Sequence, residues 1–262
     1  MDLQISGKRA LVMASSQGLG LGIARALAEE GAQVMLCGRD HKKLDVQAQL
    51  LAQQTRQRVL TAQVDLAQWD SVATLIEQVQ TQWGGVDILV NNSGGPRPCT
   101  LAEAQQSDWH QAYQMMVVSL IELTKQLVPS MKAQRWGRIL TVTSSGVEEP
   151  LPQISLSNTL RSALVGWNKT LANELADYGI TCNILIPGRI HTQRVDMLDQ
   201  AAAERLNITI EQVRERASAA IPVGRYGRVE EFAATAAFLV SHRASYITGS
   251  KIRCDGGAIR GI

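Results

Sequence analysis

The sequence predicts an α/β fold, a doubly wound, seven-stranded parallel sheet with helices on both faces. Short apolar runs bounded by glycine or polar turns alternate with amphipathic helical patterns along the 262 residues. Several apolar runs lack polar alternation, which is typical of parallel strands covered by helices on each side. With 45% hydrophobic residues, residues 1–262 are expected to fold as one domain.

Seven segments have the short apolar composition of strands: Arg9–Ala14, Gln33–Cys37, Val59–Val64, Asp87–Val90, Arg138–Thr143, Thr181–Ile186 and Lys251–Cys254. Five have helical periodicity: Leu19–Glu30, Lys42–Thr55, Ser71–Trp83, Ser107–Gln134 and Ser157–Tyr178. Gly31 and Gly179 stand where helix C-caps are expected. The more polar stretch 192–220, with a weaker helical pattern at Ile210–Ala217, interrupts the alternation and is predicted to be a substrate lid.

Composition predicts an ordinary soluble surface. The 26 basic and 24 acidic residues give a net charge of +2, so neither a nucleic acid nor a membrane is an expected partner. The cysteines are scattered, without a CxxC pair or a histidine at metal-ligand spacing, so we expect no metal site and no disulfide framework. The N-terminus has no basic start followed by an apolar core, which predicts a cytoplasmic protein.

The turn after the first predicted strand, Ala14-Ser15-Ser16-Gln17-Gly18-Leu19-Gly20, leads directly into a helix. Glycines at such a turn let the backbone approach a pyrophosphate, which then meets the free N–H groups of the helix N-terminus. A simple tight turn would have the same sequence, so this segment alone does not decide between a dinucleotide-binding turn and a purely structural one. Arg39 follows the second strand, where a base favours NADP and an acid favours NAD, although a surface arginine is the plain alternative.

Further motifs end the later strands. Asn91-Asn92-Ser93-Gly94 ends the fourth strand, and Gly137-Arg138-Ile139 leads into Ser144-Ser145. Pro187-Gly188-Arg189-Ile190-His191-Thr192 follows the sixth, and Tyr246-Ile247-Thr248-Gly249 precedes Asp255-Gly256-Gly257. With these motifs the chain resembles, from end to end, the short-chain dehydrogenase/reductase family, close to its β-ketoacyl-carrier-protein reductase-like branch. The resemblance implies a Rossmann fold, an NADP or NAD cofactor and oxidoreduction of a carbonyl/alcohol pair.

The resemblance also implies roles for the glycine turn. Gly18 and Gly20 match the second and third glycines of the family's TGxxxGxG, whereas Met13 and Ala14 replace its first two residues. The added methyl group of Ala14 is expected either to tighten the turn or to displace the diphosphate. Arg39 favours NADP, while Gln17 weakens that preference, because many NADP-binding members carry a basic residue there.

The remaining cofactor contacts implied by the resemblance come from the ends of other strands. Asp65 would meet the adenine edge, Asn91 the adenine ribose region, and Thr192 with the Pro187-Gly188 turn the nicotinamide amide. The full predicted set is Ser15, Gln17, Gly18, Leu19, Gly20, Arg39, Asp65, Asn91, Ser93, Gly94, Pro187, Gly188 and Thr192.

Four catalytic positions of the family fall on Ser144 for its serine, Ser157 for its tyrosine, Arg161 for its lysine and Met116 for its asparagine. A serine hydroxyl is far less acidic than a phenol, and arginine offers a planar fork suited to carboxylate or phosphate. Methionine cannot hold the relay water. Loss of positioned acid-base catalysis costs about 10²–10⁴-fold in rate, so efficient standard ketoreduction is not expected.

Other groups are candidates to move the proton. His191 is the better placed, because its loop borders the nicotinamide pocket in the family, although an exposed loop histidine is the plainer interpretation. Tyr113 lies one helical turn before Met116, and His110 one turn before Tyr113, so both could face the same cleft. A role in the core or in a subunit contact is the simpler explanation for Tyr113.

We hypothesise that Arg161, together with Arg97 or Arg189, binds an anionic group of a small-molecule substrate. An equally good explanation is that the three arginines are surface or scaffold residues without a common role. Two functions stay open: an oxidoreductase with altered proton transfer, or an inactive dehydrogenase-fold protein that binds a nucleotide or a partner. The fold alone does not choose between them.

The resemblance further implies a homotetramer that associates through the two long helices. Those helices carry apolar residues beyond one core stripe, namely Met115, Val118, Leu164 and Trp167, which also fit the domain core. In the predicted lid, Met197, Leu198 and Leu206 indicate apolar character without identifying a substrate.

Overall fold

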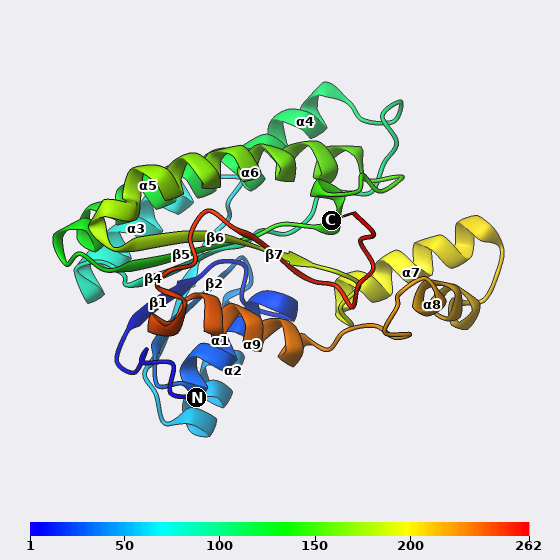
Figure 1. The fold of residues 1–262 in the computed structure, drawn as a ribbon. Coiled ribbons are helices and arrows are strands. Elements are labelled where there is room, and N and C mark those ends of the chain that lie inside the picture. The colour runs from blue at the N-terminus through cyan, green and yellow to red at the C-terminus, as the bar shows by residue number, and fades with distance from the viewer. Residues whose placement is uncertain (262) are drawn as a thin grey trace.

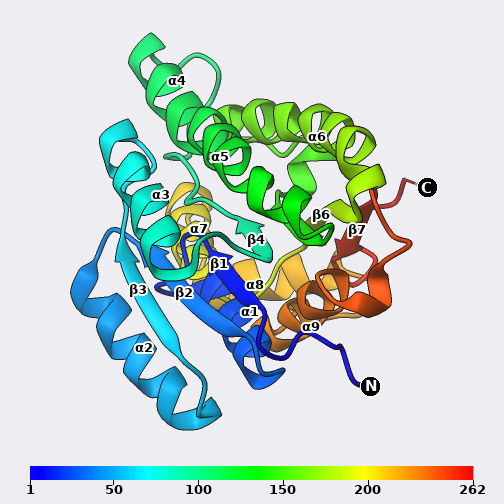
Figure 2. The same cartoon turned by 90° about the vertical axis from the view of Figure 1, so that its left-hand side faces the viewer.

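The computed structural model describes residues 1–261 and confirms the predicted sheet. Seven strands pair in parallel in the order β3-β2-β1-β4-β5-β6-β7 (Figures 1 and 2). Their bounds are β1 Arg9–Val12, β2 Gln33–Gly38, β3 Val59–Gln63, β4 Ile88–Asn91, β5 Gly137–Val142, β6 Ile180–Pro187 and β7 Lys251–Cys254. Each end lies within about two residues of the end predicted from apolar patterning, inside the usual uncertainty of element boundaries.

The helices are α1 Gly18–Glu29, α2 His41–Thr55, α3 Trp69–Trp83, α4 Gln106–Tyr113, α5 Ser119–Ala133, α6 Ser155–Leu175, α7 Gln193–Leu206, α8 Ile210–Ala219 and α9 Val229–Leu239. The segment predicted as one helix, Ser107–Gln134, is α4 and α5 joined by a π-helical turn at Gln114–Val118. Among the described residues, no helix has the length and apolar character needed to cross a bilayer.

The helices α7 and α9 were not predicted from periodicity. The α9 sequence is rich in alanine and is buried on much of its surface, so it shows little contrast between an apolar and a polar face. The helix α7 is mostly polar and begins where the Thr192 hydroxyl accepts a hydrogen bond from the Val195 N–H at 3.4 Å. Capping, rather than an apolar stripe, marks its start.

The helices form one layer on each face of the sheet. Helices α1, α2 and α9 cover one face, and α3, α4, α5 and α6 cover the other (Figures 1 and 2). Helices α1 and α9 pack closely because Gly22 has no side chain: a Cβ atom there would lie 2.1 Å from Val229 Cγ1. Helices α7 and α8 extend beyond the end of β6 (Figure 1).

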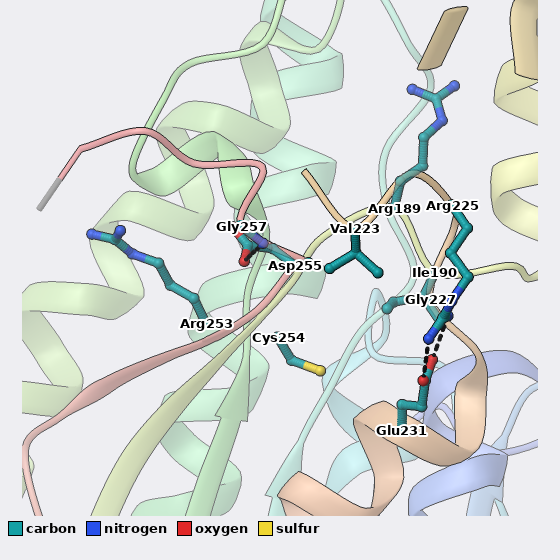
Figure 3. Close-up of a pocket in the computed structure, with 11 residues that line it drawn as sticks. Arg189, Ile190, Val223, Arg225, Gly227, Glu231, Arg253, Cys254, Asp255 and Gly257 are labelled. Carbon is teal, nitrogen blue, oxygen red and sulfur yellow. Dashed lines mark hydrogen bonds and ion pairs between the residues drawn. The ribbon is translucent and has the colours of Figure 1, made fainter. Parts of the chain in front are cut away.

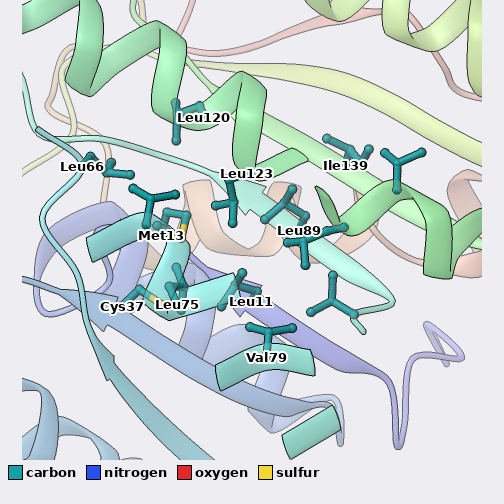
Figure 4. Close-up of a cluster of buried hydrophobic side chains, with 14 of the residues drawn as sticks. Leu11, Met13, Cys37, Leu66, Leu75, Val79, Leu89, Leu120, Leu123 and Ile139 are labelled. Carbon is teal, nitrogen blue, oxygen red and sulfur yellow. The ribbon is translucent and has the colours of Figure 1, made fainter. Parts of the chain in front are cut away.

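The core lies in two clusters, one on each side of the sheet. In β1, Leu11 packs with Leu75, Leu89 and Leu123 under the α3 to α6 layer (Figure 4). The neighbouring Ala10 and Val12 pack into the cluster under α1 and α9. Strand β1 is therefore apolar on both faces, which explains its uninterrupted apolar sequence.

A partly buried ion pair joins the first residue of β1 to the residue before β4. The Arg9 backbone N–H and Nε donate to Asp87 Oδ2 at 2.8 and 2.9 Å, and Arg9 Nη2 donates to Asp87 Oδ1 at 2.8 Å. Burial acts to raise the pKa of Asp87, but the hydrogen bonds and charge of Arg9 outweigh it and hold that pKa below its ordinary value. The pair tethers the two strands between which the sheet order reverses.

The substitution Asp87→Asn is expected to lower the free energy of unfolding by about 1.5–3 kcal/mol near neutral pH, because it removes a charged partner from partly buried hydrogen bonds. Since the folded-state pKa of Asp87 is depressed, this stabilisation is full above the unfolded pKa of about 3.9 and is lost as pH falls through the folded pKa. Urea unfolding of both proteins between pH 7 and pH 3 measures it; a difference independent of pH would contradict the assignment.

Candidate functional site

The candidate site lies at the carboxyl ends of the strands, beside the point where strand order reverses between β1 and β4. In open α/β sheets, ligands bind in the crevice at such a switch point. Four segments meet there: 14–18 after β1, 91–96 after β4, 142–147 after β5 and 187–192 after β6.

The turn after β1 opens onto the N-terminus of α1. Gly18 has a φ of +61°, and the helix starts without a side-chain cap or an acidic residue in its first turn. A Cβ atom at Gly20 would lie 2.3 Å from the Ala14 carbonyl oxygen, so only glycine lets the helix pack this closely on the turn. Gln17 is exposed and Leu19 half-buried beside these uncapped N–H groups. The arrangement suits an anion.

Ala14 occupies a backbone conformation that favours glycine, with a φ of +49°. The next residue, Ser15, is fully buried; its hydroxyl donates to the Val12 carbonyl at 2.7 Å and accepts from the Cys37 N–H at 2.8 Å. Ser15 therefore joins the turn to β2, and its hydroxyl serves the fold rather than an open contact.

At the ends of β2 and β3, Arg39 is exposed and Asp65 is half-buried. The adjacent Asp40 is engaged, because its carboxylate caps α2 by accepting from the Lys43 N–H at 3.1 Å. Asp65 Oδ1 accepts from the Ala67 N–H at 3.0 Å. The acid at the end of β2 is thus engaged, whereas the Arg39 side chain has no hydrogen bond or ion pair within residues 1–261.

Two buried polar atoms after β4 have no hydrogen-bond partner among residues 1–261: Asn91 Oδ1 and Ser93 Oγ. The Asn91 amide Nδ2 donates to Thr124 Oγ1 at 2.9 Å. At Gly94, an added Cβ would meet no atom within 4 Å. Buried oxygens without a partner call for an explanation, and a bound ligand is one that would satisfy them.

The loop after β6 closes against the glycine turn. Gly188, which follows Pro187, donates its N–H to the Cys254 carbonyl at 2.9 Å, and a Cβ atom there would lie 2.4 Å from Asp255 Cα. Thr192 lies beside Gly18, its Cγ2 being 3.8 Å from the position of a Cβ on that glycine. The structure therefore brings these two predicted contacts together, although 174 residues separate them.

Ser144 lies just beyond β5 and caps a 3-10 turn, its Oγ accepting from the Gly146 N–H at 3.2 Å. Its own hydroxyl proton is then available for another acceptor. Ser157 and Arg161 lie on successive turns of α6 and are 9% and 7% exposed. Met116 is fully buried in the core at the π-helical turn.

Arg161 reaches from α6 to the ends of two strands. Its Nη1 donates to the Val142 carbonyl at 3.1 Å and its Nη2 to the Ser93 carbonyl at 3.4 Å. Burial, and then the nearby Arg194, lower the pKa of Arg161 to about 10. The guanidinium stays charged at neutral pH, and within residues 1–261 no carboxylate pairs with it.

The other proton-transfer candidates lie in open positions. The His191 side chain is 62% exposed, and its Nε2 lies 3.2 Å from Asp196 Oδ1. Tyr113 is 50% exposed, and His110 is exposed on the same helix. Of the three, only His191 belongs to a segment that reaches the crevice, because Thr192 is its neighbour.

The hypothesised grouping of Arg161 with Arg97 or Arg189 is wrong. Arg97 pairs with Asp108 at 2.6 Å on the surface, and Arg189 pairs with the buried Asp199 of α7. Each of these guanidinium groups therefore has a carboxylate partner of its own. The arginine near Arg161 is Arg194, which sequence reasoning missed because α7 was not predicted as a helix.

A cavity of about 380 Å³ lies around the end of β7, and Arg189 and Ile190 of the loop after β6 also line it (Figure 3). Its lining includes Cys254, Asp255 and the ion pair of Arg225 with Glu231, and none of the predicted cofactor contacts. Burial raises the pKa of the Cys254 thiol, which disfavours a reactive thiolate.

The fold and the strand-end segments define a class: a doubly wound Rossmann protein with its candidate site at the topological switch point. The chain belongs to the short-chain dehydrogenase/reductase family, because the family model described as enoyl-(acyl carrier protein) reductase matches residues 13–258.

The chain is similar over nearly its full length to several named reductases. It is 30% identical to the NADPH-dependent reductase BacG of Bacillus subtilis, over 98% of this chain and 100% of that one. It is 32% identical to the 3-oxoacyl-[acyl-carrier-protein] reductase FabG of Haemophilus influenzae, over 97% and 98%. The crystal structure of L-sorbose reductase from Gluconobacter frateurii, complexed with NADPH and L-sorbose, has a TM-score of 0.95 at 33% identity and full coverage of both chains.

The substitution Ala14→Gly is expected to raise the free energy of unfolding by about 0.5–1 kcal/mol, because relief of the positive φ outweighs the added entropy of the unfolded chain. Denaturant unfolding measures it. The matched control Ala24→Gly, inside α1, should lower stability by about 1 kcal/mol or more. Equal losses in both variants would show that Ala14 is not strained.

Proposed function

We propose that this protein is an NADP(H)-dependent oxidoreductase that acts on a carbonyl/alcohol pair with a proton-transfer site different from the family's usual one. The observation that carries the proposal is the uncapped N-terminus of α1 beside Gly18 and Gly20, with Thr192 brought against it. The similarity to NADPH-dependent reductases along the whole chain supports it.

The residues present fit such a cofactor. The α1 N-terminus would hold the diphosphate, and the unpartnered Asn91 Oδ1 is an acceptor for a ribose hydroxyl. Asp65 would border the adenine, and Thr192 with Pro187 and Gly188 the nicotinamide amide. When bound, the nicotinamide supplies or accepts a hydride.

Arg39 carries the preference for NADP(H). It is exposed at the end of β2, and the adjacent acid, Asp40, is occupied in capping α2. A guanidinium binds a 2′-phosphate through paired, charge-assisted hydrogen bonds, whereas a free carboxylate here would select the ribose hydroxyl of NAD(H).

In the proposed reaction Ser144 holds the substrate oxygen, because its hydroxyl proton is available at the end of β5. Arg161 keeps a positive charge at the position that the resemblance assigns to the lysine. Ser157 is a short hydroxyl one turn before it and replaces the phenol. Proton delivery is assigned to His191, since imidazole exchanges protons near neutral pH and its loop reaches the crevice.

Residues 192–220 form the proposed lid of a single domain comprising residues 1–262. The buried Asp199 accepts hydrogen bonds from Arg189 Nη2 and the Tyr226 hydroxyl, and Arg214 lies 3.6 Å from its second oxygen. This network attaches α7 and α8 to the end of β6, so movement of the lid would be coupled to the segment that reaches the crevice.

A homotetramer is proposed through α4, α5 and α6. Met115 and Val118 lie on the π-helical turn between α4 and α5, and Trp167 lies on α6; all three are half-buried, and Met115 and Trp167 also pack against the core. Leu164 is not available for subunit contact, because it is fully buried in the core.

The substitution Arg39→Gln is expected to weaken NADPH binding by about 10–100-fold, because it removes hydrogen bonds to a charged phosphate. Affinity for NADH should stay within about twofold. Fluorescence titration with both cofactors measures the two values. Arg58→Gln, an exposed arginine before β3, is the matched control and should change neither. Equal loss for both cofactors would refute a phosphate-binding role.

Single-turnover hydride transfer from bound NADPH to a panel of ketones, and from alcohols to NADP+, tests the reaction itself. We expect Ser144→Ala to slow transfer by about 10²–10³-fold through loss of the oxygen-holding hydrogen bond. Ser157→Ala should change the rate by less than about threefold, because a serine hydroxyl is a poor acid.

The His191→Asn variant tests proton delivery in the same assay, with an altered pH profile expected. An unchanged rate and pH profile would remove His191 from the mechanism. Tight NADPH binding without transfer to any substrate would instead identify a nucleotide-binding protein without turnover.

A further inference from the structure

We propose that Arg161 and Arg194 together form a carboxylate-binding site, so that the substrate is a small oxo acid or its hydroxy-acid partner. This inference rests on the proposed function and names the class of its substrate. It follows from the contacts of the two guanidinium groups, from their lack of acidic partners within residues 1–261, and from two unpartnered hydroxyls on Ser93 and Thr143, at or next to residues whose carbonyls Arg161 contacts.

The two arginines come from different helices and contact the same short loop after β4. Arg161 Nη2 of α6 donates to the Ser93 carbonyl at 3.4 Å, and Arg194 Nη2 of α7 donates to the Pro96 carbonyl at 2.9 Å. Gly95 lies between these acceptors, and a Cβ atom there would be 3.2 Å from Arg194 Nη2. Because Gly95 has no side chain, there is space for the Arg194 guanidinium beside the loop.

Neither arginine has a counter-ion within residues 1–261. Every ion pair of the described chain involves other basic groups, including Arg97 and Arg189. Burial lowers the pKa of both Arg161 and Arg194, and the charge of Arg194 lowers that of Arg161 further. Arg161 is buried and Arg194 is half-buried. Two neighbouring cations that are withdrawn from water without an acid repel each other, and a bound anion would relieve that repulsion.

A second buried arginine shows what a purely structural role looks like. Arg138 at the start of β5 donates to three carbonyls, those of Ser241, Gly137 and Gly179, at 3.0, 2.8 and 3.2 Å. Arg161 donates to only two, the longer of them at 3.4 Å. A guanidinium has five N–H groups, so Arg161 retains donors for a bidentate ligand.

Two buried hydroxyls adjoin the carbonyls that Arg161 contacts. Ser93 Oγ belongs to one acceptor residue, and Thr143 Oγ1 to the residue after Val142. Both are buried and have no hydrogen-bond partner among residues 1–261. Gly94 and Gly95 are exposed, so the same loop borders solvent.

The location favours a substrate carboxylate over a phosphate of the cofactor. Arg161 contacts Val142, two residues before Ser144, which is proposed to hold the reacting oxygen. A carboxylate close to the reacting carbonyl would therefore meet both groups. The proposed diphosphate position is instead at the N-terminus of α1, where backbone N–H groups already supply the donors.

The test compares pyruvate, acetoacetate and phenylpyruvate with their methyl esters, which keep the carbonyl and lose the charge. Calorimetric titration of the NADP+-loaded protein is expected to show at least one acid binding about tenfold or more tighter than its ester. Arg194→Ala and Arg161→Gln should each weaken binding of that acid by about 10–100-fold and change ester binding by less than about twofold.

Arg97→Gln is the matched control, because Arg97 lies on the same loop but pairs with Asp108; it should keep the preference for the acid. Circular dichroism checks the fold of each variant. If Arg161→Gln does not fold, Arg194→Ala decides alone, since α7 lies outside the sheet layers. Equal binding of every acid and its ester in the unmodified protein would overturn the proposal.

Two further readouts separate this inference from the proposed function. NADPH titration of the same variants should give affinities within about threefold of the parent protein; a large loss of NADPH affinity with unchanged acid binding would assign the arginines to the cofactor and overturn the proposal. Hydride transfer to acids and esters alike would also overturn it while leaving the oxidoreductase function intact. Preferential acid binding without hydride transfer would support the carboxylate site and refute the oxidoreductase function.

Discussion

The reversal of strand order between β1 and β4 is the constraint on which the rest of this molecule depends. Strand β1 pairs with β2 on one side and β4 on the other, so the connections after β1 and β4 leave toward opposite faces and open a crevice between them. Burial of both sheet faces holds the strands rigid. Segments from four strand ends are thereby held at one edge of the sheet, where α1 presents its free N–H groups.

The same edge concentrates positive charge that the protein itself does not neutralise. Arg161 is buried with two carbonyl contacts, and Arg194 lies beside it. Burying a charge without a partner is unfavourable, and such unfavourable arrangements cluster at sites of ligand binding. Arg138, outside the crevice, instead donates to three carbonyls. Ala14, at positive φ in the turn after β1, is a second local departure from ideal geometry at the same edge.

The elements predicted correctly are those whose structure is determined by a pattern among neighbouring residues. The strands were predicted because they are short apolar runs, several of them apolar on both faces, and the glycine turn because Gly18 and Gly20 have recognisable spacing before a helix. Sequence reasoning failed for α7 and α9, whose sequences lack a clear apolar stripe. Missing α7 hid Arg194, and the anion-binding hypothesis therefore selected Arg97 and Arg189, which are paired with Asp108 and Asp199.

The sequence by itself determined the fold class, the family and the strand-end segments that border the crevice, because periodicity, glycine spacing and short motifs are properties of neighbouring residues. Only the tertiary structure decided which polar groups remain unsatisfied. Spacing along the chain does not encode the direction in which a side chain points. The partners that the side chains find therefore could not be read from the sequence, as for Asp40, Arg97, Arg189 and Arg161. The close approach of Arg194 to the loop after β4 is such a contact: 98 residues separate it from Pro96, and packing of α7 at the end of β6 brings them together.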